Sequence, residues 1–90
     1  MAIELTADDI ARVTHHFRAR LPMWVVYRPS NHDYPGLWVM RMHITLPEPS
    51  ATSLVVAHED LEALHELIPE WLTNLGRAAG DDVYIEEVWL

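Results

Sequence analysis

The sequence predicts an α+β fold in which a mostly antiparallel sheet of about four strands carries helices on one face, in the order α-β-β-β-α-β. Four segments are enriched in aromatic and β-branched residues, as strands are, and two have helical spacing of apolar residues. Prolines at 22, 29, 35, 47, 49 and 69 separate these segments. The length of 90 residues suits a single small domain, residues 1–90, with one thin core.

The first predicted helix covers Ala7 to Arg20. Thr6 is a good N-cap, and Asp9 at the third helical position makes an approximate capping box. Pro22 is expected to end the helix. Its apolar face consists of Ile10, Val13, Phe17 and Leu21.

A hairpin is predicted next, with strands at Met23–Arg28 and Leu37–Thr45. Tyr34-Pro35-Gly36 within the connection fits a type II turn. The second strand alternates, so its outward face should carry Arg41 and His43. Its inward face should carry Trp38, Met40, Met42 and Ile44.

The stretch after the hairpin permits two interpretations. Ser53–Ala57 reads as a short strand followed by a helix at Glu59–Ile68, or one long helix begins at Ser53. The β-branched pair Val55 and Val56 favours the strand. Val83–Leu90 is the last predicted strand.

Both faces of the first strand are apolar, which predicts burial on both sides. Two helices cannot cover both faces of the sheet, so a second subunit or another protein is expected to cover the rest. We expect a homodimer, although each aromatic side chain could instead fill the core. The predicted interface residues are Trp24, Val26, Tyr27 and Trp89.

A polar patch is predicted beside this interface. Arg41, His43 and Arg28 form a candidate site for a small anion or a partner's carboxylates. The alternative is solvation, or pairing with Glu86 or Glu87 of the last strand.

Six histidines suggest a metal site, and His58, Glu62 and His65 would share one face if all three were helical. Zinc or another divalent metal would suit them, although a solvated helix flank is the simpler interpretation. In the hairpin connection, His32 and Asp33 could form a base and its orienting acid, or could simply be turn residues. No other cofactor is predicted.

Charge and composition narrow the function. The net charge of −8 argues against direct nucleic-acid or membrane binding, and the absence of cysteine excludes disulfides and thiolate zinc sites. No secretion signal is evident, so a cytoplasmic location is expected. We expect a non-enzymatic interaction or regulatory module. The alternatives are a metal-dependent or histidine-based small enzyme, and an acidic inhibitor of a nucleic-acid enzyme.

Two short stretches carry a resemblance. Tyr27-Arg28-Pro29 with Asp33-Tyr34-Pro35, together with the ending from Asp81 to Leu90, resembles an uncharacterised small bacterial domain. The similarity leaves out the helix before Pro22. It implies a bacterial or phage source and attaches no function.

Overall fold

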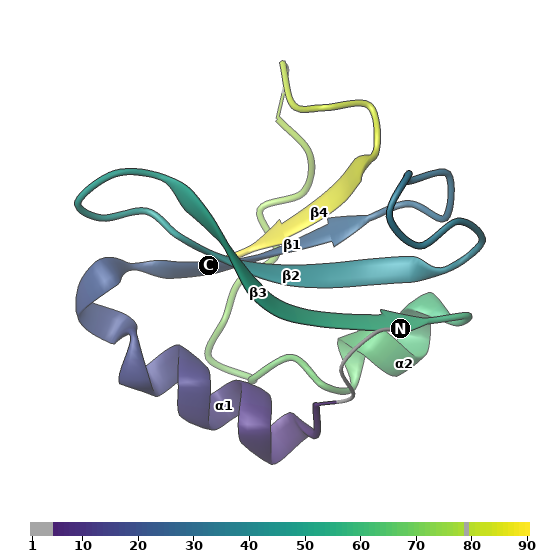
Figure 1. Cartoon of the computed structure of the whole chain (residues 1–90). Helices are drawn as coiled ribbons and strands as arrows, with labels where there is room; N and C mark the ends of the chain where they lie inside the picture. The colour runs from purple at the N-terminus through teal and green to yellow at the C-terminus, as the bar shows by residue number, and fades with distance from the viewer. Residues whose placement is uncertain (1–4, 79) are drawn as a thin grey trace.

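The computed structural model describes residues 5–78 and 80–90 and contains a four-stranded antiparallel sheet with helices on one side (Figure 1). The strand order in the sheet is β3-β2-β1-β4. The predicted α+β class and the chain order α-β-β-β-α-β are confirmed. The elements are α1 (Ala7–His16), a 3-10 turn η1 (Arg18–Arg20), β1 (Pro22–Tyr27), β2 (Trp38–Ile44), β3 (Ser50–His58), α2 (Leu61–His65) and β4 (Ile85–Trp89).

Helix α1 begins as predicted and ends earlier. Thr6 Oγ1 accepts from the Asp9 N–H at 3.1 Å, and Asp9 Oδ2 accepts from the Thr6 N–H at 3.0 Å, so the capping box is complete. The helix stops at His16, and the tighter η1 carries the chain to Leu21. Leu21 has φ 48° and ψ 71°, a left-handed conformation, immediately before Pro22. A residue before proline is disfavoured in the right-handed helix, so the chain leaves the helix here.

The predicted hairpin forms with an antiparallel register that runs from Pro22↔Ile44 to Tyr27↔Val39. The predicted turn is present, because the Leu37 N–H donates to the Tyr34 carbonyl at 3.1 Å and Gly36 has φ +88°. The residues of β2 that were predicted to point inward do contribute to the core.

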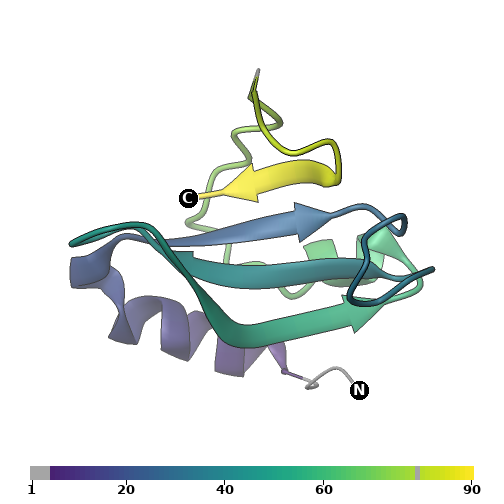
Figure 2. The same cartoon turned by 45° about the horizontal axis from the view of Figure 1, so that its top comes forward.

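The core lies between the sheet and the helices, which cover the same face (Figures 1 and 2). Trp24, Met40 and Met42 are completely buried there. The Trp24 indole N–H donates to Thr14 Oγ1 at 2.9 Å, and this hydroxyl donates to the Ile10 carbonyl. One threonine thus satisfies the polar group of the largest core side chain and ties β1 to α1.

The ambiguous stretch is a strand, β3, followed by a short helix. β3 extends to Ser50 on its N-terminal side, and its register with β2 shifts between Arg41 and His43. The Thr52 hydroxyl donates to the Met42 carbonyl at 2.7 Å at this irregularity. Helix α2 has five residues, half the expected length, and its buried anchor is Leu64.

Strand β4 is also paired on its outer side near its end. Thr73 and Leu90 exchange two backbone hydrogen bonds of 3.0 Å, and the Leu75 N–H donates to the Val88 carbonyl at 2.7 Å. Asn74 forms an isolated bridge with Trp89. Within residues 5–78 and 80–90, no helix has the length and apolarity needed to cross a membrane.

Candidate binding surface on the open sheet face

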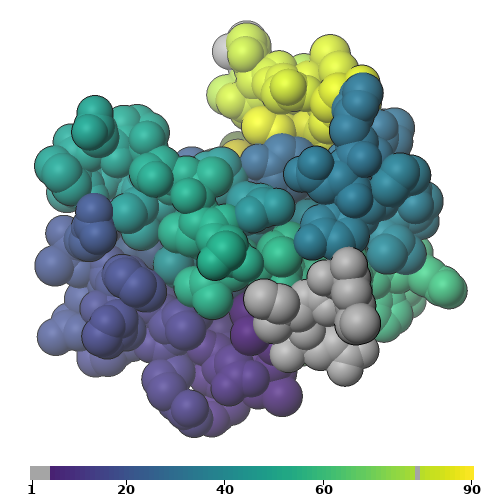
Figure 3. Space-filling model, viewed as in Figure 1, coloured from purple at the N-terminus to yellow at the C-terminus, as the bar shows by residue number. Residues whose placement is uncertain are grey.

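The sheet face opposite the helices, which we call the open face, is apolar with a few polar side chains. The register places every second residue of β1 and β2 on this face, together with the residues of β3 and β4 that pair with them across register shifts. The space-filling view shows a notch in the outline between the β2–β3 connection and the segment before β4 (Figure 3). The face comprises Met23, Val25, Tyr27, Val39, Arg41, His43, Val55, Ile85 and Val88.

Part of the open face is buried by the chain itself. Val25, Val39 and Val55 are only 2%, 3% and 4% exposed. Side chains from the β1–β2 connection and from residues 75–81 line the hollows over this face. The expectation that one chain cannot cover the second face therefore holds for only part of that face.

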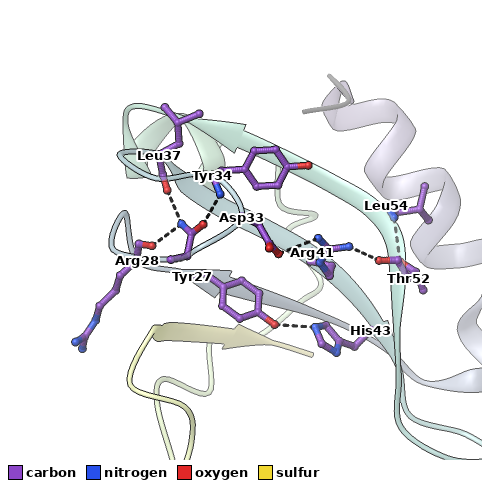
Figure 4. Close-up of polar contacts among 10 residues, drawn as sticks. Tyr27, Arg28, Asp33, Tyr34, Leu37, Arg41, His43, Thr52 and Leu54 are labelled. Carbon is purple, nitrogen blue, oxygen red and sulfur yellow. Dashed lines mark hydrogen bonds and ion pairs between the residues drawn. The ribbon is translucent and has the colours of Figure 1, made fainter. Parts of the chain in front are cut away.

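Asn31 fastens the β1–β2 connection. Its Nδ2 donates to the carbonyls of Arg28 at 2.7 Å and Leu37 at 2.9 Å, and its Oδ1 accepts from the Tyr34 N–H at 2.7 Å (Figure 4). The residue is 8% exposed, which is unusual for an asparagine in a loop. The sequence indicated only a turn former here, because nothing local shows that both ends of an eight-residue connection converge on one amide.

A hollow of about 370 Å³ lies on the open face between β1, β4 and the segment before β4. We call it the open-face hollow. Its size falls within the range of about 300 to 1,000 Å³ that is typical of ligand sites. The residues that line it are mainly apolar: Met23, Val25, Tyr27, His43, Leu75, Gly76, Ala78, Asp81, Ile85 and Val88.

Tyr27 and His43 form a hydrogen-bonded pair at the wall of this hollow, with 3.0 Å between the phenol oxygen and Nε2 (Figure 4). Burial raises the pKa of Tyr27 above its ordinary 10.0, against an opposing effect of Arg41. Burial, helped by the positive charge of Arg41, lowers the pKa of His43 below its ordinary 6.5. Both groups are therefore neutral at pH 7, so this pair adds no charge to the wall of the hollow.

Arg41 borders a second, smaller hollow of about 160 Å³ that shares Tyr27 with the first. Its Nη1 donates to the Thr52 carbonyl at 2.7 Å, and its Nη2 lies 3.8 Å from the Asp33 carboxylate (Figure 4). The side chain is only 22% exposed. Arg41 and His43 are thus neighbours on the open face, whereas Arg28 pairs with Glu86 at 2.7 Å. That pairing is the alternative that the sequence analysis offered for Arg28.

The predicted interface residues fall on opposite faces of the sheet. Trp24 and Val26 are 0% exposed beneath the helices, so they are unavailable to a partner in this structure. Trp89 lies on the same helix-covered face, where its ring meets His65 at 5.6 Å between centroids. Only Tyr27 lies on the open face. Alternation along β1 separates Trp24 and Val26 from Tyr27, and the pairing of β1 with β4 places Trp89 on the face of Trp24.

The predicted metal site does not form. His58 is the last residue of β3 and accepts from the Asp60 N–H, so it does not share a helix with Glu62 and His65. Among the described residues, no group of three histidine, aspartate or glutamate side chains could hold a metal ion. The expected shared helix face required His58 to be helical, and in the structure His58 belongs to β3.

Glu87 has a role that the sequence did not suggest. His65 Nε2 lies 2.7 Å from Glu87 Oε1, and the Trp89 indole N–H donates to the same oxygen at 3.1 Å. Asn74 Nδ2 donates to Glu87 Oε2 at 3.3 Å. The carboxylate therefore joins α2, β4 and residue 74.

His32 in the β1–β2 connection was a candidate base that Asp33 could orient. Its Nε2 lies 2.9 Å from the Tyr84 hydroxyl instead, and no contact with Asp33 orients the ring.

The open-face hollow thus combines a mainly apolar lining with a neutral polar pair at its wall. The resemblance to a small bacterial domain stays a prediction. Comparison of the chain with protein-family models, with curated proteins and with solved structures finds no match.

Proposed function

We propose that this protein is a non-enzymatic interaction module that forms a homodimer through its open face. One observation supports the proposal most directly: the apolar open-face hollow lies beside exposed apolar side chains of the same chain. Leu75 is 58% exposed and contributes to the lining of the hollow, and Val83 is 64% exposed in the same segment. Exposed apolar surface of this kind marks an interaction site.

A second copy fits this arrangement. In a two-fold interface, both subunits contribute the same patch. The side chain that enters the partner's hollow must therefore lie on the same surface as the hollow of its own subunit. Leu75 lines the hollow, and Val83 lies in sequence between Asp81 and Ile85, which also line it. A second copy could place its own Leu75 and Val83 over Val25 and Val88.

Charge also favours this face. The chain carries −8, which repels a second copy over most of its surface. In the strands and loops around the open face, positive and negative side chains are nearly balanced. They are Arg28, Arg41, Arg77, Asp33, Asp81, Asp82 and Glu86.

Sedimentation velocity over a concentration series from low to high micromolar tests the dimer. We expect the native chain to dimerise, and Leu75→Asp and Val83→Asp each to give a monomer, because both would place a charge in an apolar interface. Leu46→Asp is the matched control, since Leu46 is 44% exposed and outside the open face. Circular dichroism checks that each variant is folded.

A native chain that remains monomeric at high micromolar concentration would overturn the proposal. Dimerisation that survives both Leu75→Asp and Val83→Asp would overturn it as well. A dimer lost in Leu46→Asp would place the interface at the other end of the molecule.

A further inference from the structure

A second exposed apolar surface lies where α1 leads into β1 and β4 ends (Figure 1). Leu21, Trp71 and Leu90 are 49%, 61% and 46% exposed and line one hollow of about 270 Å³. Leu46 is 44% exposed and joins them, because its N–H donates to the carbonyl of Arg20, next to Leu21. We call these four residues the end patch.

Leu21 is unfavourable in two ways at once. Its φ of 48° is in the left-handed region, where glycine is the unstrained residue. Its apolar side chain is also half exposed to water. A glycine here would remove both costs, so the leucine side chain is the feature that needs explaining.

Two arginines border the end patch. Arg18 lines its hollow and donates from Nη1 to the His15 carbonyl at 2.9 Å. Arg20 donates from Nε to the Leu46 carbonyl at 3.1 Å. These bonds hold both guanidinium groups beside the leucines. Each guanidinium has further N–H groups that can donate to a bound partner.

Arg12, Arg28 and Arg41 each make an ion pair, whereas Arg18, Arg20 and Arg77 donate to backbone carbonyls. Arg12 pairs with Asp8, and Arg28 pairs with Glu86. Neither Arg18 nor Arg20 makes an ion pair within residues 5–78 and 80–90. The sequence has no carboxylate side chain from residue 10 to residue 32. In a chain of net charge −8, Arg18 and Arg20 therefore give one side of the end patch positive charge, although Glu48 and Glu70 stand near Leu46 and Trp71 in the sequence.

We propose that the end patch docks an acidic amphipathic segment of another protein. Its apolar side chains would cover Leu21 and Trp71, and its carboxylates would accept from Arg18 and Arg20. The overall negative charge opposes an anionic lipid surface or a nucleic acid as the occupant. The charge of the patch makes an acidic protein segment the favoured one.

Labelled helical peptides with leucine and glutamate on adjoining faces test this docking by fluorescence anisotropy. We expect saturable binding of the glutamate peptide, with binding about tenfold or more weaker when glutamine replaces glutamate. Backbone amide NMR shifts should cluster at residues 14–22, 46, 71–72 and 90. Raising the salt concentration should weaken binding.

Variants locate the site. Arg18→Gln with Arg20→Gln, and separately Trp71→Ala, should each weaken binding about tenfold or more. Arg12→Gln is the matched control, because Arg12 is already paired with Asp8. Leu75→Asp should bind the peptide normally whether or not it dimerises. The experiments can therefore reject the docking site and the proposed dimer independently of each other.

Several results would overturn the docking site. These are the absence of saturable binding, equal binding of a lysine version of the peptide, equal binding of anionic lipid vesicles or of DNA, or shifts that cluster on the open face. Self-association that is lost in Trp71→Ala would show that the end patch binds a second copy of the chain. Circular dichroism of each variant excludes unfolding as the reason for lost binding.

Discussion

At the scale of single residues, two side chains occupy positions that their chemistry disfavours. Leu21 has a left-handed backbone, and His43 is half buried beside Arg41 with a lowered pKa. Neither contributes to the buried cluster between the sheet and the helices. Both lie at surfaces for which we propose partners. Residues in conformations or environments that reduce stability often occur at such functional surfaces.

Replacing Leu21 by glycine should stabilise the fold. Glycine removes the left-handed strain but loses more chain entropy on folding, which leaves a net gain of about 0.5 kcal/mol in the free energy of unfolding. Urea denaturation measures it. Leu21→Ala is the control, because alanine keeps the strain and should give no gain. A glycine variant less stable than the alanine variant would contradict this explanation.

Acid should destabilise the protein partly through His43. Because its pKa is below 6.5 in the folded state, the unfolded chain binds its proton first as the pH falls through 6.5. The free energy of unfolding should therefore decrease with acid in this window, and it should decrease less steeply in His43→Gln. NMR titration of the native chain should give a His43 midpoint below 6.5. A midpoint above 6.5 would contradict the burial of this ring.

At the scale of elements, patterns confined to one segment predicted well. The alternation of β2 gave its correct inner face, and Thr6 with Asp9 gave the start of α1. Features that depend on distant partners were missed. Ser50 and Ala51 have little strand preference and become strand by pairing with Ile44 and His43. The same limit applies to the candidate interface, because only the pairing of β1 with β4 shows that Trp89 lies on the same face as Trp24.

The link between α1 and β1 is expected to depend on the Thr14 hydroxyl. Thr14→Val keeps the volume but leaves the buried Trp24 indole N–H without an acceptor, which should cost about 1 to 3 kcal/mol. Thermal or urea unfolding measures the loss. Thr14→Ser retains the hydroxyl and should lose much less. Equal losses in the two variants would show that the methyl group matters more than the hydrogen bond.

At the scale of the whole molecule, the two proposed surfaces differ in charge. The open face is nearly balanced within a chain of net charge −8, whereas the end patch is bordered by Arg18 and Arg20, which make no ion pair with a described residue. Long-range electrostatics therefore opposes the dimer and favours the acidic segment. One chain could bind a copy of itself and a different protein at the same time.

Salt should affect the two interactions in opposite directions. Screening shortens from about 10 Å at 0.1 M salt to about 3 Å at 1 M. Self-association should strengthen, because repulsion between copies is screened, and binding of the glutamate peptide should weaken. Sedimentation velocity and anisotropy over the same salt series measure the two effects. A change of the same sign in both would contradict the assigned charges.

The pairing of residues 73–75 along β4 has a further consequence. Within the described residues, it leaves β3 as the side of the sheet where backbone groups stay free to pair. A sheet that can be extended from one side only adds one neighbour and then stops, because both remaining sides of the joined pair are occupied. Strand-by-strand growth into a fibre needs two free sides. The short stretch from Thr73 to Leu75 thus covers the end of β4, so that β3 is the more accessible edge for accidental strand exchange.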